Sequence, residues 1–322
     1  MGDSDDMWNR APLLARIVSS SVRIAQSAGN TIKTIIANGD LGIVEKGSES
    51  CPDPQTEADR AAQFLIVKSL EEKFKGVIII GEEETTSAVA LERGYDPLPL
   101  SLSLPIELLS TREEDFVVWV DPLDGTGEIA KSKDKSLATL QQVTVLIGVA
   151  LHGNVVGGVI HQPWYGVNGE GRTVWAIKGC GVHGMTPCGG RDERVIVTTR
   201  SHSTPTVDQA LQELEKRGLS HKVERVGGAG FKVLKVLEGA AAYVFASGGC
   251  KKWDTAAPQA ILEAAGGKLT DISGRCLSYS AEVQKNNSGG VLASAPWVNH
   301  HEYLSALPQQ LKESLPERIH SL

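Results

Sequence analysis

Two carboxylates stand three residues apart in the segment Asp121-Pro-Leu-Asp-Gly-Thr126, directly after the apolar run 116–120. An apolar run that is closed by proline and glycine predicts a buried strand with its acids at the carboxyl end. Two buried anions this close repel each other, so either their pKa values rise or a cation lies between them. Mg²⁺ is the usual partner of clustered carboxylate oxygens. The alternative is a plain turn that caps a helix, because Asp-Gly is also common turn chemistry.

Two further acidic motifs follow apolar or glycine-rich segments elsewhere in the chain. Gly81-Glu82-Glu83 comes after the run 77–80, which predicts a second buried strand, so Glu82 mirrors the position of Asp121. Trp253-Asp254 lies between a predicted strand at 243–246 and a predicted helix over 258–265. Asp254 alone is also consistent with a simple helix N-cap. The three motifs together favour a metal site built from strand and helix ends.

The elements that must position these acids alternate between helix and strand. Apolar residues at spacings of three and four predict a long helix over 13–36 and a second over 56–74, which Thr56 and Asp59 begin as a capping box. Further strands are predicted at 143–149, 155–160, 173–177, 195–199 and 268–271, with a helix at 231–237. This pattern predicts an α/β (α+β layered) fold with two sheets sandwiched between helices. The proline-rich stretch 85–114 is expected to be a surface excursion.

Composition excludes several classes of function. A net charge of -7 over 322 residues argues against broad binding to nucleic acids or to anionic membranes. The five cysteines show no CxxC or zinc-type spacing, which is typical of reduced thiols in an intracellular protein. No apolar run reaches the ~18 residues of a transmembrane helix, and the acidic start is unlike a leader, so a cytoplasmic location is expected. Without GxGxxG, a dinucleotide-dependent oxidoreductase is disfavoured.

The three acidic motifs, in this order, resemble those of the lithium-sensitive, magnesium-dependent phosphatase superfamily that includes the inositol monophosphatases. Within it, the chain is most similar to the 3'(2'),5'-bisphosphate nucleotidase family, over about residues 19–293. The segments that carry this closer likeness are 39–46, 55–59, 198–202, 225–230 and 250–254. The resemblance implies an inositol-monophosphatase-like sandwich of alternating helix and sheet layers.

The resemblance also implies a set of metal ligands and a pair of residues that activate water. Two or three Mg²⁺ ions are expected at Glu82, Asp121, Asp124, Asp254 and the backbone carbonyl of Leu123. Asp59 and Thr126 are expected to orient and deprotonate the attacking water, the Thr126 hydroxyl relaying to the carboxylate. From the residues alone, Asp59 is better explained as a helix cap, and only the resemblance makes it a base.

For the substrate, the resemblance implies a small nucleotide. Thr199, His202, Gly228 and Lys232 match the positions that contact the adenosine phosphate moiety. Gly227 to Gly230 lead into a helix whose free N–H groups could approach a phosphate, although such glycines also form ordinary flexible turns. The implied reaction removes the 3'-phosphate of adenosine 3',5'-bisphosphate to give AMP, with 3'-phosphoadenosine 5'-phosphosulfate as a second substrate. We expect residues 1–196 to carry most metal ligands, and residues 197–322 to carry Asp254 and the nucleotide-binding residues.

One position departs from the family pattern. Gly127 stands where the family usually has lysine, and the longer connection that follows carries Lys131, Lys133 and Lys135. These lysines either restore the missing charge near the phosphate or form a solvated surface insertion. Two alternative functions remain at this point: an inositol polyphosphate 1-phosphatase, and a catalytically weak nucleotide-binding sensor. The oligomeric state is left open.

Overall fold

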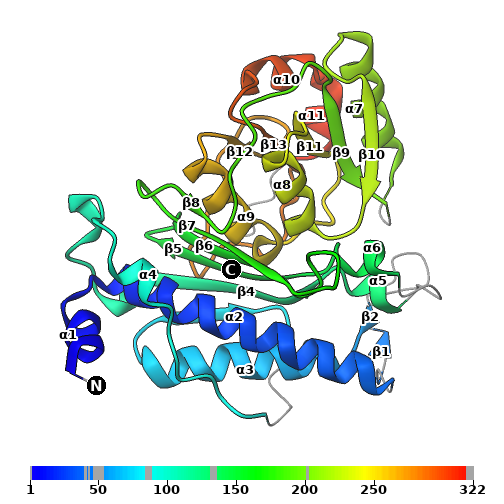
Figure 1. Cartoon of the computed structure of the whole chain (residues 1–322). Coiled ribbons are helices and arrows are strands. Elements are labelled where there is room, and N and C mark those ends of the chain that lie inside the picture. The colour runs from blue at the N-terminus through cyan, green and yellow to red at the C-terminus, as the bar shows by residue number, and fades with distance from the viewer. Residues whose placement is uncertain are drawn as a thin grey trace.

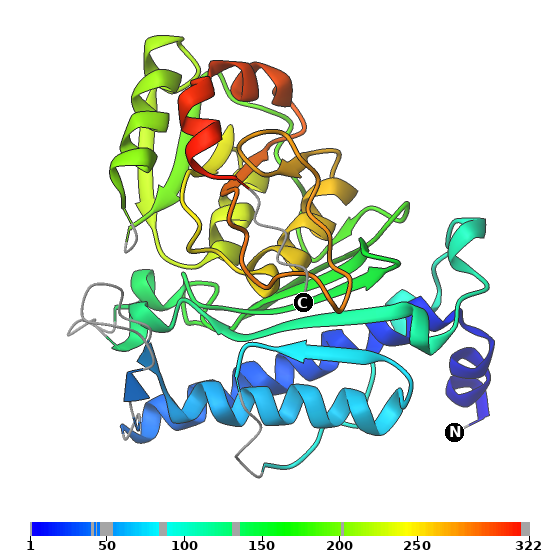
Figure 2. The ribbon, with the colours of Figure 1, turned by 180° about the vertical axis from the view of Figure 1, so that it is seen from behind.

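Helices and sheets alternate in layers through the molecule (Figure 1). The computed structural model describes residues 2–39, 42, 44–45, 54–83, 89–130, 136–200 and 203–316. Two long helices form one outer layer, followed by a six-stranded sheet, a pair of inner helices, a five-stranded sheet and an outer group of helices. The same order is seen from behind in Figure 2. The predicted α/β layered sandwich is therefore confirmed.

The outer layer consists of α2 (Leu13–Asn38) and α3 (Glu57–Lys73), close to the predicted bounds. A short helix, α1 (Gly2–Arg10), precedes them. Helix α2 buries its apolar stripe against α3 and the sheet, and it ends at Gly39, whose φ of 85° suits glycine. Thr56 and Asp59 form the predicted capping box of α3. A two-stranded ladder of β1 (Val44–Glu45) and β2 (Pro54–Gln55) lies between the helices in sequence.

The six-stranded sheet has the order β3-β4-β5-β6-β7-β8. Its strands are β3 (Ile78–Gly81), β4 (Phe116–Asp124), β5 (Thr144–Leu151), β6 (Asn154–Gln162), β7 (Arg172–Ile177) and β8 (Val182–His183). Strands β3 and β4 are parallel, and each later neighbour pairs antiparallel. Every residue of β4 is buried, as predicted. The prediction that 77–80 is a buried strand is wrong in its burial, because β3 is an edge strand with Ile78 43% exposed.

The five-stranded sheet has the order β10-β9-β11-β13-β12. Its strands are β9 (Val195–Thr199), β10 (Lys222–Val226), β11 (Ala242–Phe245), β12 (Lys268–Thr270) and β13 (Val291–Ser294). Helices α7 (Pro205–Lys216), α10 (His300–Ala306) and α11 (Gln309–Ser314) belong to the same half of the chain. The sequence pattern predicted neither strands β10 and β13 nor these three helices. The predicted division after residue 196 falls inside β9, and the existence of two separate domains stays a prediction.

Two inner helices, α8 (Ala229–Leu237) and α9 (Lys252–Ala264), lie between the sheets. Helix α9 approaches the six-stranded sheet so closely that a Cβ added to Gly148 would lie 2.4 Å from the Ala256 Cβ. The predicted start at Pro258 is wrong, because α9 begins at Lys252 and holds Pro258 in its interior. The real start places Asp254 in the first turn, where its carboxylate accepts the Lys251 N–H at 2.7 Å.

The stretch predicted as a surface excursion contributes to the core. It contains α4 (Pro97–Leu100) and two 3₁₀ turns, η1 (Ile106–Leu108) and η2 (Glu113–Asp115). Leu100, Leu104 and Leu108 are all less than 9% exposed and join the apolar cluster around α2, so that prediction is wrong for these residues. No helix in the described part of the chain combines the length and apolar character needed to cross a membrane.

Candidate active site

The acids predicted to bind metal meet at one end of the six-stranded sheet. Asp121 and Asp124 lie in the last part of β4, and both are buried. Glu82 follows β3, and its N–H donates to the carbonyl of Val120 at 3.1 Å. Because β3 and β4 are parallel, their carboxyl ends lie at the same edge. Asp254 reaches this edge from the first turn of α9, whose close packing on the sheet brings it there.

The charges of these acids act on one another. Burial raises the pKa of Asp121 well above its usual range, and the charges of Glu82, Asp124, Asp254 and Asp59 raise it further, in that order. Burial, followed by the charge of Asp124, raises the pKa of Asp254 to about 6, against the lowering effect of hydrogen bonds from Lys251 and with Asp121. A cluster of this kind needs protons or a cation to offset its charge.

The donor set fits a hard divalent cation such as Mg²⁺, because it consists of carboxylate oxygens with a backbone carbonyl nearby. Among the residues that the structure describes, however, no three acidic, histidine or cysteine side chains already surround a common ion position. Both oxygens of Asp124 accept hydrogen bonds from amides of α8. The Leu123 carbonyl is also engaged, because it accepts the Thr126 hydroxyl at 2.8 Å. Ligation by these residues therefore stays a prediction.

Asp124 joins the two halves of the chain. Its Oδ1 accepts the N–H of Ala229 at 2.8 Å, and its Oδ2 accepts the N–H of Gly230 and the hydroxyl of Thr144, each at 2.8 Å. A carboxylate at a helix N-terminus is stabilised by these amides and by the helix dipole. The expectation that the N–H groups of the Gly227–Gly230 segment approach a phosphate is thus not met for Ala229 and Gly230, which bind Asp124 instead.

Asp59 and Thr126 form a hydrogen-bonded pair beside the acids. The Thr126 Oγ1 lies 2.9 Å from Asp59 Oδ1, while the backbone N–H of Thr56 donates to Asp59 Oδ2 at 2.8 Å. Burial raises the pKa of Asp59 to about 6, and the hydrogen bonds from Thr56 and Thr126 oppose this rise. The capping and catalytic interpretations of Asp59 are therefore compatible, because one oxygen serves the cap and the other faces Thr126.

The predicted substrate-binding residues that the structure describes lie at the carboxyl end of β9 and in the first turn of α8. Thr199 ends β9 and is buried, and Gly228 precedes α8 with a φ of 62°. A Cβ on Gly228 would lie 2.6 Å from the carbonyl oxygen of Gln142, so the close approach requires glycine. Lys232 is buried: its Nζ donates to the Gly228 carbonyl at 3.1 Å and lies 5.4 Å from the centre of the Tyr243 ring. His202 lies outside the described residues.

Burial lowers the pKa of the Lys232 ammonium, and the nearby charges of Asp124, Cys250 and Asp254 oppose the decrease. The cation therefore lies within electrostatic reach of the acid cluster. This position is suited to a group that carries negative charge between the acids and the five-stranded sheet.

Three residues in the site had no predicted role: Glu128, Gln142 and Arg200. The Arg200 guanidinium donates to Glu128 Oε2 at 2.7 Å and to Gln142 Oε1 at 3.2 Å. Glu128 follows the acid motif and Arg200 lies inside the 198–202 motif, so their positions were visible in the sequence, but their pairing across 72 residues was not. Nothing in the sequence marked Gln142.

Gly127, the position that departs from the family pattern, opens α5 (Thr126–Ala130) together with Thr126. A Cβ added there would meet no atom within 4 Å, so the structure leaves room for a side chain. The connection continues through α6 (Leu137–Leu140) to β5. Lys131, Lys133 and Lys135 lie outside the described residues, and both explanations of that segment stay predictions.

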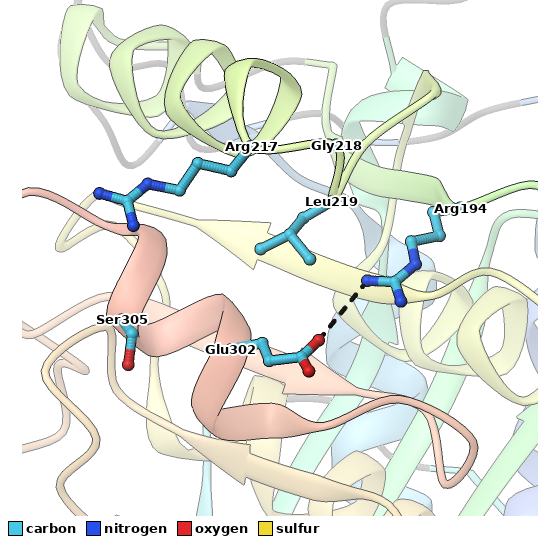
Figure 3. Close-up of a pocket in the computed structure, with 6 residues that line it drawn as sticks. All are labelled: Arg194, Arg217, Gly218, Leu219, Glu302 and Ser305. Carbon is cyan, nitrogen blue, oxygen red and sulfur yellow. Dashed lines mark ion pairs between the residues drawn. The ribbon is translucent and has the colours of Figure 1, made fainter.

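A surface hollow lies far from these residues, between the end of α7 and α10 (Figure 3). Arg194 pairs with Glu302 across it, with 3.7 Å between Nη1 and Oε2, and Arg217 lies at its other side. None of the predicted site residues lines this hollow. The candidate active site is therefore the acid cluster and not the hollow.

Comparison with known proteins identifies the family to which this fold and acid cluster belong. Residues 14–312 match the model of the inositol monophosphatase family, and the chain belongs to this family. It is 44% identical to 3'(2'),5'-bisphosphate nucleotidase 1 of Mus musculus over 94% of this chain and 97% of that protein. The Homo sapiens protein of the same name is also 44% identical, with the same coverage. The Dictyostelium discoideum one is 32% identical, over 91% of this chain and 96% of that protein.

Solved structures show the same fold at much lower identity. The extragenic suppressor protein suhB from Bartonella henselae superposes with a TM-score of 0.64 at 21% identity, covering 90% of this chain and 97% of that one. An IMPase from Thermotoga maritima superposes with a TM-score of 0.61 at 21% identity, covering 92% and 98%. These two structures support the layered architecture alone.

Proposed function

We propose that this chain is a Mg²⁺-dependent phosphomonoesterase that removes the 3'-phosphate of adenosine 3',5'-bisphosphate, giving AMP and inorganic phosphate. The observation that carries the proposal is the Thr126–Asp59 hydrogen bond, which lies beside the cluster of acids around the buried Asp121. The 44% identity to relatives named 3'(2'),5'-bisphosphate nucleotidase 1 supports the choice of substrate.

The proposed metal ligands are Glu82, Asp121, Asp124, Asp254 and the carbonyl oxygen of Leu123, which together would hold two or three Mg²⁺ ions. When bound, Mg²⁺ supplies positive charge that favours deprotonation of water and offsets the charge of the phosphate. The acids suit this role because burial first, and then the charges of neighbouring carboxylates, raise the pKa values of Asp121 and Asp254. A bound cation would offset both effects.

Thr126 and Asp59 are the proposed route for the proton of the attacking water. The Thr126 hydroxyl accepts this proton as it passes its own to Asp59 Oδ1, 2.9 Å away. With a pKa of about 6, Asp59 is mostly ionised at neutral pH and can accept it. The water oxygen then bonds to phosphorus, the bond from phosphorus to the ribose 3'-oxygen breaks, and that oxygen takes a proton from solvent.

Thr199, His202, Gly228 and Lys232 are the proposed contacts of the nucleotide. The buried Lys232 ammonium provides charge for a phosphate oxygen, and the missing side chain of Gly228 lets the chain pass close to Gln142 and Asp124. We extend the proposal to 3'-phosphoadenosine 5'-phosphosulfate as a second substrate, to inhibition by Li⁺ and to a cytoplasmic location.

The direct test is phosphate release from adenosine 3',5'-bisphosphate and from inositol 1,4-bisphosphate, each with Mg²⁺, with EDTA and with added Li⁺. We expect a strong preference for the nucleotide that EDTA abolishes and Li⁺ reduces. Preference for the inositol substrate would overturn the proposed nucleotide pocket and favour an inositol polyphosphate 1-phosphatase. Tight nucleotide binding without phosphate release would favour a sensor.

A further inference from the structure

A fork of hydrogen bonds from Arg200 crosses the boundary between the two sheets. Its guanidinium contacts Glu128, which follows the acid motif of β4, and Gln142, which precedes β5. The side chain of Glu128 is only 8% exposed, while that of Arg200 is 45% exposed. The Arg200 N–H also donates to the Val226 carbonyl at 3.2 Å, which anchors the residue to the end of β10. Arg200 therefore connects three segments, two through its side chain and one through its backbone N–H.

Gln142 connects Arg200 to the turn at Gly227 and Gly228, which precedes α8. Its Oε1 accepts both the Arg200 guanidinium and the N–H of Gly227, the latter at 2.8 Å. Its Nε2 donates to the Ala138 carbonyl at 3.2 Å, which fixes the orientation of the amide. Glu128 lies flat against the same turn, because a Cβ on Gly227 would be 2.4 Å from Glu128 Oε1. The turn is thus held from two sides.

The position of this turn determines the direction of the first N–H groups of α8. Ala229 and Gly230 follow it directly, and their N–H groups donate to the two oxygens of Asp124. A displacement of the turn would move these donors and release or rotate the Asp124 carboxylate. The side chains that hold the turn therefore control the orientation of a proposed metal ligand, although the groups that donate to Asp124 are those of Thr144, Ala229 and Gly230.

We propose that Arg200, Glu128 and Gln142 form a positioning clamp that sets the affinity of the site for its divalent cation through the α8 amides and Asp124. The inference rests on the proposed function in one respect, the assignment of Asp124 as a metal ligand. The clamp also connects two proposed site segments: the one with Thr199, directly before Arg200, and the one with Thr126. Residues that orient a metal ligand commonly change metal affinity by about 10- to 100-fold when they are replaced.

The test measures Mn²⁺ binding by calorimetry without substrate, because this readout does not depend on which phosphoester is hydrolysed. Arg200→Gln removes the charge and shortens the side chain, whereas Arg200→Lys keeps the charge but loses the fork. We expect about tenfold weaker Mn²⁺ binding in Arg200→Gln and a smaller loss in Arg200→Lys. Glu128→Gln combined with Arg200→Gln should add little to the loss, because the two residues act through one turn.

Arg93→Gln is the matched control, since Arg93 forms an exposed ion pair with Glu72 at 2.9 Å, away from the site. It should leave Mn²⁺ binding unchanged. The proposal is overturned if folded Arg200→Lys and Arg200→Gln bind Mn²⁺ within twofold of the wild type, even if both melt at lower temperature. If the wild-type protein hydrolyses no nucleotide, the proposed function is wrong. The Mn²⁺ binding measurements would still test the clamp.

Discussion

Replacing Asp59 with asparagine separates the free-energy cost of burying this carboxylate from its use in catalysis. Asparagine fits the site, because its oxygen can accept the Thr56 N–H and its amide can donate to Thr126, whose hydroxyl then donates to Leu123. The replacement removes the charge and keeps the hydrogen-bonded geometry. We therefore expect a variant that is more stable than the wild type without metal, yet nearly inactive.

The magnitude follows from the pKa of Asp59, which rises from 3.8 to about 6 on folding. Because the folded-state pKa is the higher one, the folded protein binds the proton more tightly. This contribution to stability is present below pH 3.8 and is lost as the pH rises through about 6. The full difference corresponds to about 3 kcal/mol, and the part lost between pH 5 and pH 8 is about 1.4 kcal/mol.

The assay is urea unfolding of both proteins in EDTA at pH 8 and at pH 5. The variant should be more stable at pH 8, by at most about 3 kcal/mol, and its advantage should shrink by about 1.4 kcal/mol at pH 5. The variant must be compared with the wild type at each pH, because burial also lowers the pKa of His161 and of His300 to about 4. These histidines change the stability of both proteins with pH in the direction opposite to Asp59. Phosphate release should fall by about 10²- to 10⁴-fold in the variant. A variant less stable than the wild type at pH 8, or a difference that does not change with pH, would refute the reasoning.

Three other replacements test separate parts of the site. Thr126→Val should lower kcat by about 10²-fold or more, because the hydroxyl is the proposed relay, and Thr126→Ser should retain most of the activity. Equal kcat values for the two variants in steady-state assays would contradict this role. Asp124→Asn should lower activity by orders of magnitude, and near-native turnover would refute the metal assignment. The variant should also lose about 2–4 kcal/mol of stability in urea unfolding, because its amide would face the donors of α8 or Thr144. Gly228→Ala should destabilise the protein and weaken substrate binding, since its Cβ would lie 2.6 Å from the Gln142 carbonyl oxygen, and an unchanged KM with unchanged Tm would show that the backbone can yield there.

The parts of the site that the sequence predicted are those in which local pattern and chemistry agree. The apolar run before Asp121 predicted β4 correctly, since an all-apolar strand closed by proline and glycine has few alternatives. Thr56 and Asp59 predicted the start of α3, because a capping box is a local interaction. The identity of the acids as a group was also visible, because each follows a strand or begins a helix.

Interactions between distant segments could not be predicted in this way. The bonds from the α8 amides to Asp124 span more than 100 residues, and periodicity carries no information about them. Local rules also failed where tertiary packing overrides them. The position of Pro258 predicts a helix start, but contact with the six-stranded sheet and the Asp254 cap keep Pro258 inside α9. The proline-rich sequence around Leu100, Leu104 and Leu108 predicts a surface loop, whereas these side chains pack into the apolar cluster around α2.

The most direct test of the central claim, that the clustered acids form a divalent-cation site, is the anomalous scattering of Mn²⁺ in crystals of this protein. We predict density between Glu82, Asp121 and Asp254, with Asp124 and the Leu123 carbonyl completing the coordination. The peak should be lost in Asp121→Asn crystals grown under the same conditions. Density at some other place in the wild-type crystal, or none at Mn²⁺ concentrations that support activity, would contradict the account.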